Sequence, residues 1–413
     1  MASIPAADLA REILEACLRD GTWQSRVLDA LIERALDESD LLTAHAATRA
    51  LFGIIVERLA DLFEPQLCDV YARLFSHVIA RALPDYSASD LLVRYRNVRR
   101  VREFPGGQID RVYMLSRVTL GADVAVTSVF MNAVKQRFPD AEIALVGPEK
   151  NAELFAADPQ VRHISVAYGR SSLLRDRLMA ALELQTLVDE TGTIVVDPDS
   201  RLTQLGLIPV CDDARYYFFE SRGYGGEFDD SLPQLASQWA GHVFDLSNAR
   251  PYIAPMPQPR VADITVSLGV GENTAKRMDD AFEREVVEAL LLRGGDVLID
   301  RGAGGEEADR VNAIAKDLGE PATLLLHDGS YASFAGHILQ SKLYVGYDSA
   351  GQHVACAGNI PLVSVFAGYA SDRMFQRWRP IAPRSHVVRV GDESRDETLA
   401  RTLKAISEAA QES

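Results

Sequence analysis

A short polar cluster near the C-terminal end of the chain includes residues 349–351, whose backbone N–H groups could bind a phosphate at the start of a helix. The cluster comprises Asp348, Ser349, Gly351 and His353. The apolar run 343–345 precedes it, and a second apolar run, 362–366, follows it. Short apolar runs bounded by Gly and Pro are typical of strands buried on both faces of a parallel sheet. We therefore expect the cluster at the carboxyl edge of a sheet and at the start of a helix, where ligands bind in open α/β sheets and where phosphate is attracted.

A second candidate phosphate contact is Lys276. It follows the Gly-rich segment 269–275, which comes directly after the apolar run 264–268. The segment lacks the third glycine of a dinucleotide-binding fingerprint, and it is not a P-loop. A lysine ammonium is a compact point charge that suits a phosphate group. Lys276 therefore either binds phosphate or is a solvated surface lysine.

Carboxylates also follow two predicted strands in the N-terminal half of the chain. Asp123 lies after the first of these strands and opens a predicted helix. It is either a general base that takes a proton from a substrate or a helix N-cap, a position that Asp favours. Asp197, Asp199 and Arg201 come after the run 193–196. They either contact a substrate or form a simple polar turn.

The order of the predicted elements indicates how these residues are positioned. Strands alternate with helices from about residue 105 onward, which predicts an α/β protein with right-handed parallel sheets. The segment 250–259 contains four prolines and predicts a stiff linker. Residues 1–104 have helical apolar spacing and no strand pattern. We therefore predict an all-helical domain at 1–104 and two α/β domains, at 105–250 and 251–413.

Two segments have more than one interpretation. The helical domain either recognises an acceptor, mediates oligomerisation, or is a cap that only packs. Residues 215–229 are rich in aromatic residues and glycine. They either present aromatic faces to a sugar or form a strand with a surface loop.

Composition and charge exclude several classes of protein. The 413 residues carry a formal net charge of −16, which disfavours nucleic acid and anionic membrane surfaces as partners. The four cysteines are scattered, without the spacing of a metal site, and indicate a reduced, cytosolic protein. The N-terminus lacks the apolar region of a secretory signal, and no run approaches the ~20 apolar residues of a membrane span. We therefore expect a cytoplasmic protein that is not an integral membrane protein.

The motifs together resemble those of the heptosyltransferases, glycosyltransferase family 9. The family's D-[ST]-G-x-x-H core is similar to the cluster at 348–353, with Ala350 inserted before the glycine. The family also carries a Gly-Asp pair after its first strand and a phrase like the RFPDAEI found here at 137–143. In this chain Ala122 separates Gly121 from Asp123. The resemblance covers roughly residues 110 to 410.

The resemblance implies the glycosyltransferase B architecture, in which two Rossmann-like domains face each other across the site. It implies a metal-independent, inverting glycosyltransferase without a cofactor, which uses a nucleotide-diphosphate sugar such as ADP-heptose. Asp123 would be the catalytic base, and Asp197, Asp199 and Arg201 would lie on the acceptor side. The donor would be bound by Lys276, Thr274, Glu306 (with Glu307 as its rival), Asp348, Ser349, Gly351 and His353. The inserted Ala122 favours a second hypothesis, a catalytically inactive nucleotide-sugar-binding or scaffold protein, and an epimerase of similar architecture is a third.

Overall fold

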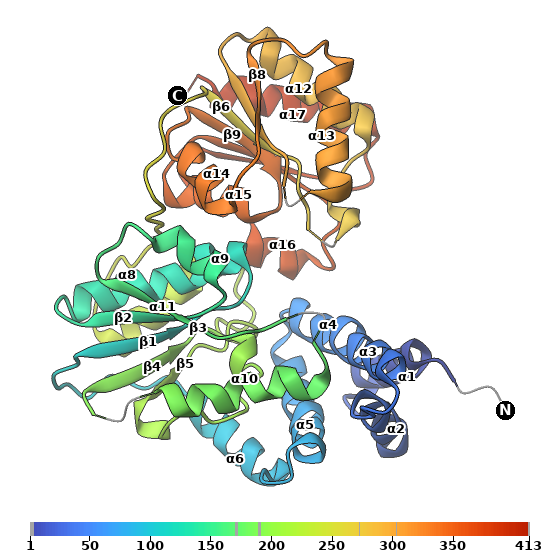
Figure 1. Ribbon diagram of the computed structural model, residues 1–413, viewed down its shortest axis with the longest axis vertical. Helices are drawn as coiled ribbons and strands as arrows, with labels where there is room; N and C mark the ends of the chain where they lie inside the picture. The colour runs from blue at the N-terminus through green and yellow to red at the C-terminus, as the bar shows by residue number, and fades with distance from the viewer. Residues whose placement is uncertain (1–3, 170–171, 189–190, 272, 303, 412–413) are drawn as a thin grey trace.

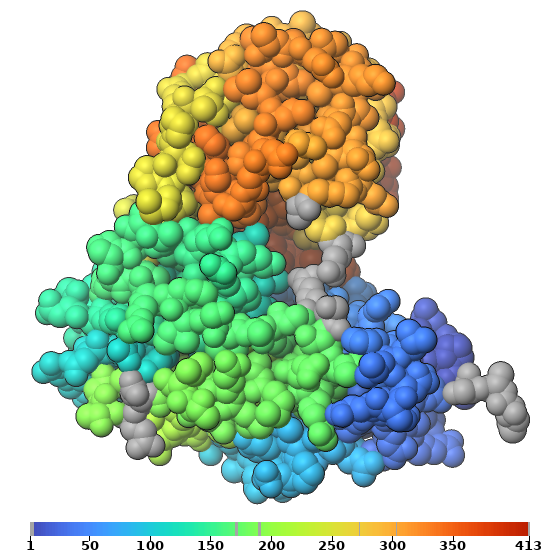
Figure 2. Space-filling view, in the orientation of Figure 1, coloured from blue at the N-terminus to red at the C-terminus, as the bar shows by residue number. Residues whose placement is uncertain are grey.

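The computed structural model describes residues 4–169, 172–188, 191–271, 273–302 and 304–411. It shows two α/β lobes, one above the other, with the N-terminal helices packed against the lower lobe (Figure 1). The surface is hollowed between the upper lobe and the blue helical segment (Figure 2). Each lobe contains one parallel sheet, which confirms the predicted class of two Rossmann-like domains.

The sheet of the lower lobe has five parallel strands in the order β3-β2-β1-β4-β5. The strands are β1 (Arg111–Leu115), β2 (Glu142–Gly147), β3 (Val161–Ser165), β4 (Thr193–Asp197) and β5 (Tyr216–Phe218). The central strand β1 is in register with both neighbours, since Val112 pairs with Ile143 on β2 and with Ile194 on β4. The carboxyl ends of β1 and β4 therefore lie side by side at the edge that faces the upper lobe.

Both faces of this sheet are buried, because side chains alternate along each strand. Val112 and Met114 pack in one hydrophobic core with α8 (Ser128–Arg137) and α11 (Leu232–Phe244). Tyr113 and Leu115, the intervening residues of β1, pack in a second core with α10 (Leu174–Leu187) and several N-terminal helices. The near-continuous apolar character of the strands follows from this double burial.

The N-terminal segment consists of helices, as predicted, and within residues 4–100 the structure describes no strand. Its helices are α1 (Ala6–Asp20), α2 (Ser25–Ala35), α3 (Leu41–Ala50), a π-helical turn (Leu51–Val56), α4 (Glu57–Asp61), α5 (Pro65–Ala82) and α6 (Ala88–Val98). Tyr71 and Phe75 of α5 lie in the same core as Tyr216 and Phe218 of β5. The helices therefore cover one face of the sheet, and the predicted boundaries at 104 and 250 stay predictions. Among the helices described here, none combines the length and the apolar character required to cross a membrane.

The sheet of the upper lobe has six parallel strands in the order β11-β10-β9-β6-β7-β8. The strands are β6 (Ile264–Ser267), β7 (Val297–Asp300), β8 (Leu324–His327), β9 (Leu343–Tyr347), β10 (Leu362–Phe366) and β11 (Ser385–Arg389). One face packs against α12 (Asp280–Leu292), α13 (Gly305–Asp317) and α17 (Arg395–Ala409). The other face packs against α14 (Tyr331–Ile338) and α15 (Ala350–Ala357). The strand, helix and strand predicted for 343–366 are thus β9, α15 and β10.

The aromatic segment 215–229 forms a strand and a loop. Tyr216, Tyr217 and Phe218 make up β5, and Phe219 follows directly after it. These four side chains are buried in the two cores of the lower lobe. The structure therefore supports the strand interpretation for these four residues and gives them no exposed face on which a sugar could stack.

The two lobes are held together by arginines of α16 (Asp372–Trp378). Arg377 is 1% exposed, and its Nη1 donates to the carbonyl oxygens of Phe228 and Asp230, at 2.6 Å each. Arg373 donates to the carbonyl of Gly226, and its Nε lies 3.5 Å from a carboxylate oxygen of Glu64. Helix α16 of the upper lobe is therefore bound both to the lower lobe and to the helical segment.

Candidate functional site

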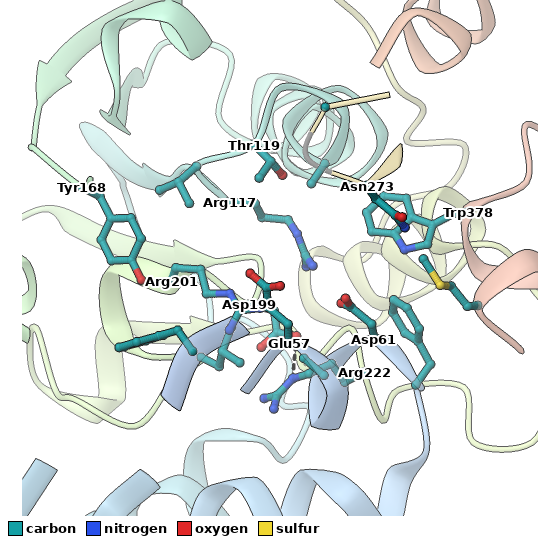
Figure 3. A pocket seen from close by; sticks show the side chains of 18 of the residues that line it. Glu57, Asp61, Arg117, Thr119, Tyr168, Asp199, Arg201, Arg222, Asn273 and Trp378 are labelled. Carbon is teal, nitrogen blue, oxygen red and sulfur yellow. Dashed lines mark hydrogen bonds and ion pairs between the residues drawn. The ribbon is translucent and has the colours of Figure 1, made fainter. Parts of the chain in front are cut away.

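A cavity of about 610 Å³ lies where the upper lobe, the lower lobe and the helical segment meet (Figure 3). The helical segment contributes Phe52, Glu57, Ala60, Asp61 and Phe63 to its lining. The lower lobe contributes Arg117, Val118, Thr119, Ala122, Tyr168, Arg177, Asp199, Arg201, Leu205 and Arg222. The upper lobe contributes Val270, Gly271, Asn273, Lys276, Met374 and Trp378. The lining described here includes five basic and three acidic side chains, so the cavity suits an anion although the whole chain is acidic.

Two of the predicted donor-binding residues, Lys276 and Asp348, form an ion pair at this cavity. The ammonium nitrogen of Lys276 lies 2.6 Å from Oδ2 of Asp348. Gln352 Nε2 donates to the other carboxylate oxygen of Asp348 at 2.6 Å. The loop after β10 closes against Lys276, because a Cβ at Gly368 would lie 2.3 Å from the carbonyl oxygen of Ala275. Asp348 therefore orients the lysine, whose side chain is 19% exposed and remains accessible to a ligand.

The cluster at 349–353 forms the first turn of α15, as the sequence predicted. Ser349 precedes the helix with an extended backbone. Gly351 allows close packing, because a Cβ there would lie 2.1 Å from the hydroxyl oxygen of Tyr344. His353 is buried at 6% exposure beside the ring of Trp378, and burial lowers the pKa of its imidazole to about 4 although Asp348 favours the charged form. His353 is thus a neutral, packed residue of α15, and it is not among the described residues that line the cavity.

The remaining predicted donor contacts lie at the edge of the site. Thr274 is exposed in a short 3-10 turn, Thr274–Lys276, and its neighbour Asn273 lines the cavity. Glu306 is exposed on the first turn of α13. Glu307 instead turns inward and packs against Gly269, because a Cβ added at Gly269 would lie 2.2 Å from the Oε1 of Glu307. Burial raises the pKa of the Glu307 carboxyl. Of the two rival carboxylates, Glu307 is the one that contacts the loops at the carboxyl edge of the upper sheet.

Asp123, the predicted base, lies behind the wall of the cavity and does not face the cavity. Its side chain is fully buried, and burial raises the pKa of its carboxyl. It accepts hydrogen bonds from Ser116 Oγ at 2.5 Å, Arg117 N at 2.7 Å, Thr127 Oγ1 at 2.5 Å and Asn151 Nδ2 at 2.5 Å. Ala122, its neighbour, lines the cavity. The catalytic role of Asp123 stays a prediction, while its contacts are those of a residue that joins β1 to the following helix.

Two π-helical turns border the cavity. One, Leu51–Val56, leads into α4, and the other, Asp123–Thr127, follows the short helix α7 (Leu120–Ala122). Gly121 of α7 lies against α15, because a Cβ there would be 3.3 Å from both Ala350 Cα and His353 Cδ2. Turns of this kind are rare and occur frequently at functional sites. Here they place the start of the lower-lobe helix and α4 on the rim of the same cavity.

The three residues predicted on the acceptor side have different environments. Asp197 is fully buried and accepts hydrogen bonds from Ser200 N, Thr203 Oγ1 and Tyr216 OH, so it holds the turn after β4. Asp199 and Arg201 line the cavity. The backbone of Asp199 is left-handed, with φ of +71°, a conformation that Asp tolerates better than most residues and that recurs at functional sites.

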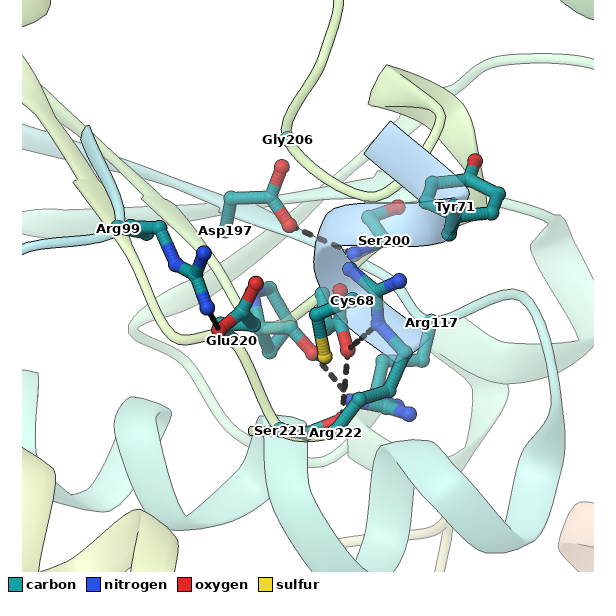
Figure 4. Close-up of polar contacts among 12 residues, drawn as sticks. Cys68, Tyr71, Arg99, Arg117, Asp197, Ser200, Gly206, Glu220, Ser221 and Arg222 are labelled. Carbon is teal, nitrogen blue, oxygen red and sulfur yellow. Dashed lines mark hydrogen bonds and ion pairs between the residues drawn. The ribbon is translucent and has the colours of Figure 1, made fainter. Parts of the chain in front are cut away.

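Asp199 is part of a buried polar network that connects the cavity to the helical segment. Figure 4 labels its partners Ser221 and Arg222 together with Tyr71. The Oδ2 of Asp199 accepts from Ser221 Oγ at 2.7 Å and from Arg222 Nε at 3.0 Å. The guanidinium of Arg222 lies 4.8 Å from the ring centre of Tyr71 on α5, and its Nη2 is 3.4 Å from the hydroxyl of Tyr95 on α6. Burial acts to raise the pKa of Asp199, but the charges of Arg222 and Arg117 outweigh it and keep the pKa below its usual range.

Several lining residues had no signal in the sequence. Arg117, Arg222 and Asp61 are single charged residues without a motif, and tertiary packing alone brings them to the cavity. Trp378 belongs to α16, where its ring contacts Phe63 edge-on at 6.2 Å between centres. A charged residue directly after a predicted strand, as Arg117 is, was the one available cue.

Comparison with known proteins gives matches over most of the two lobes. Residues 227–405 match the model of glycosyltransferase family 9 (heptosyltransferase). A lipopolysaccharide heptosyltransferase 3 from Escherichia coli is 34% identical over 123 residues, which cover 27% of this chain and about a third (35%) of that protein. The protein of the same name from Escherichia coli strain K12 is 23% identical over 289 residues, covering 62% of this chain and 82% of that one.

Solved structures of similar fold cover both lobes. The ADP-heptose lipopolysaccharide heptosyltransferase II of Escherichia coli matches with a TM-score of 0.53 and 17% identity, over 73% of this chain and 99% of that one. A glycosyl transferase of family 9 from Veillonella parvula matches with a TM-score of 0.56 and 14% identity, over 74% of this chain and 98% of that one. At these identities the likeness shows the shared fold of two facing α/β domains.

Proposed function

We propose that this chain, whose residues 227–405 match the model of glycosyltransferase family 9, transfers a sugar from a nucleotide-diphosphate sugar to an acceptor hydroxyl. The observation that carries the proposal is the basic cavity between the two lobes, whose upper wall includes Lys276, the ion-pair partner of Asp348. A diphosphate carries negative charge that the excess of cations would neutralise. The lower lobe and the helical segment leave room for an acceptor on the other wall.

The donor side of the mechanism follows from the upper lobe. Lys276 would neutralise the diphosphate as its charge grows in the transition state, and stabilisation of such developing charge usually contributes more to catalysis than any other single effect. The backbone N–H groups at the start of α15 would add hydrogen bonds at a helix N-terminus. ADP-heptose is the first donor to consider, since a solved relative is named for it.

The reaction itself would be an in-line displacement with inversion. The acceptor oxygen attacks the anomeric carbon while the bond from that carbon to the diphosphate oxygen breaks, and the diphosphate leaves with the electron pair. In this scheme cations of the chain stabilise the leaving group, so the reaction is proposed to be independent of a metal. A base must take the proton of the acceptor hydroxyl, because that hydroxyl is a weak nucleophile until the proton leaves.

One observation favours the second candidate function, a binding protein without catalysis. Ala122 lines the cavity at the start of the lower-lobe helix, whereas Asp123 is buried behind it among four donors. A chain of this kind would bind nucleotide sugars and release no nucleoside diphosphate from them. Release of nucleoside diphosphate from a bound sugar nucleotide separates the two functions.

We predict that a nucleoside diphosphate raises the stability of the chain and that Lys276→Ala removes most of the effect. A ligand that binds the native state alone adds about 2.7 kcal/mol at a hundredfold excess over its dissociation constant. Thermal melts with ADP, UDP and GDP measure the rise, each variant being compared with its own ligand-free form. Lys404→Ala, an exposed lysine of α17, is the control and should keep the full effect. A melting temperature that is the same without nucleotide and with each of the three nucleotides would refute the donor site.

A further inference from the structure

Asp61, the last residue of α4, places a carboxylate in the cavity. It is half-buried, and it forms no hydrogen bond or ion pair with any other residue that the structure describes. In Figure 3 its carboxylate points toward the middle of the cavity, on the side of the Arg117 guanidinium. A half-buried carboxylate normally pairs with a donor. The absence of a partner in a cavity rich in cations indicates that Asp61 is positioned for a ligand.

The position of Asp61 is fixed by the residues that follow it. The backbone of Phe63 is left-handed, with φ of +54°, which is a strained conformation for an aromatic residue. The Phe63 side chain is 2% exposed and packs edge-on against Trp378 of the upper lobe. One residue later, Glu64 pairs with Arg373 of α16 at 3.5 Å. Contacts with the upper lobe therefore hold the end of α4 against the wall that carries Lys276.

The other acidic side chains of the cavity are less suited to accept a proton. Asp199 is bound to Arg222 and Ser221, and the adjacent cations keep its pKa low. Glu57 lies one helical turn before Asp61, at the start of α4, and its charge interacts with that of Arg177. The helix that opens the lower lobe contributes Ala122 to the cavity and turns Asp123 away from it.

We propose that Asp61 is the general base of the glycosyl transfer, supplied by the helical segment rather than by either α/β lobe. The inference rests on the proposed function. In the step, the acceptor O–H bond breaks and its proton passes to a carboxylate oxygen of Asp61. The acceptor oxygen forms a bond to the anomeric carbon, and the diphosphate departs with the electrons of the broken bond. The proton on Asp61 then passes to water, which restores the carboxylate.

The charge environment of Asp61 is consistent with this role. Burial raises the pKa of Asp61, and the charges of Arg201, Lys276, Arg117 and Arg58 act against that rise. Glu57 and Asp199 are the other acidic side chains among the described residues that line the cavity. A base whose pKa is moved toward neutral pH is a better proton acceptor in the transition state. The rate should therefore fall on the acidic side as Asp61 becomes protonated.

The test uses the full-length chain and measures release of nucleoside diphosphate with water as the acceptor. The probes are ADP-heptose, ADP-glucose, UDP-glucose and GDP-mannose, and the one that the wild type hydrolyses fastest is used throughout. We expect Asp61→Asn to slow release by about 10²–10⁴-fold. Its affinity for the nucleoside diphosphate should be equal or slightly tighter, because a negative charge near Lys276 is removed. The acidic limb of the pH–rate profile, present in the wild type, should be absent from Asp61→Asn.

Asp85→Asn is the matched control, since Asp85 is an exposed carboxylate of the same helical segment, and it should hydrolyse the probe at the wild-type rate. Wild-type rates in Asp61→Asn overturn the inference and leave the proposed function standing. A loss of rate in Asp123→Asn but not in Asp61→Asn would also overturn the inference and leave the proposed function standing, because it would assign the base to Asp123. A wild type that binds nucleoside diphosphates but releases none from any probe overturns the inference and supports the binding protein. A wild type that neither binds nor hydrolyses overturns both proposals.

Discussion

Replacing Arg222 by methionine is expected to lower the free energy of unfolding by about 3–5 kcal/mol, the usual result of removing one partner of a buried ion pair. Arg222 and Asp199 have side chains 3% and 1% exposed, and their N–O distance is 3.0 Å. Without the guanidinium, Asp199 keeps a buried charge that only Arg117 and Ser221 remain to stabilise. Arg222 also lies over the ring of Tyr71, so the substitution removes a contact between the helical segment and the cavity wall.

Equilibrium urea unfolding measures this loss, and two variants serve as controls. Arg81→Met removes surface pairs with Glu33 at 3.2 Å and with Asp29 at 3.8 Å, and should cost at most about 1 kcal/mol. The double variant Arg222→Met, Asp199→Asn should recover part of the stability, because it no longer buries an unpaired charge. A loss for Arg222→Met no larger than that for Arg81→Met would contradict the account of the network in Figure 4.

The second large effect is a pH dependence caused by Asp197. Burial raises the pKa of its carboxyl to about 6, although Thr203, Tyr216 and Ser200 donate hydrogen bonds to it. A carboxyl whose pKa is raised in the folded state stabilises that state fully at pH values below its unfolded pKa of 3.8. This stabilisation is lost as the pH rises through the folded-state pKa of about 6. A difference of about two pKa units corresponds to about 3 kcal/mol.

The stability difference between Asp197→Asn and the wild type isolates this contribution, since the other groups titrate in both. The free energy of unfolding of the variant should rise relative to that of the wild type as the pH rises. The total change should be about 3 kcal/mol, and most of it should occur between pH 4 and pH 7. Urea unfolding of both chains at a series of pH values gives the difference. A constant difference, or one that moves the other way, would show that Asp197 is charged in the folded state at acidic pH.

The upper-lobe side of the cavity could be predicted from the sequence because its signals are local. The runs that became β9 and β10 lie on either side of 348–353, so strand, turn and helix place Asp348 and Ser349 at the sheet edge wherever the rest of the chain folds. Lys276 follows β6, which neighbours β9, and parallel pairing brings the two loops together. The ion pair between Lys276 and Asp348 is the outcome of that topology.

On the opposite wall of the cavity, Asp199 and Arg201 were predicted because they follow a strand, but the other charged residues could not be predicted in this way. One residue advances a helix by about 100°, so the extra Ala122 is enough to place alanine toward the cavity and Asp123 away from it. Asp61 and Arg222 reach the cavity only because the helical segment shares a core with the sheet of the lower lobe. That packing depends on contacts between residues more than 100 positions apart, such as Tyr71 with the carbonyl of Gln204, which local patterns do not encode.

A crystal structure of the chain with the nucleotide sugar that stabilises it most tests the central claim directly. We predict a diphosphate in the cavity, with an oxygen about 3 Å from Lys276 Nζ and others near the first amides of α15. The anomeric carbon should face the space between Asp61 and Arg117. A nucleotide sugar bound outside this cavity, or one whose sugar points away from Asp61, would contradict it.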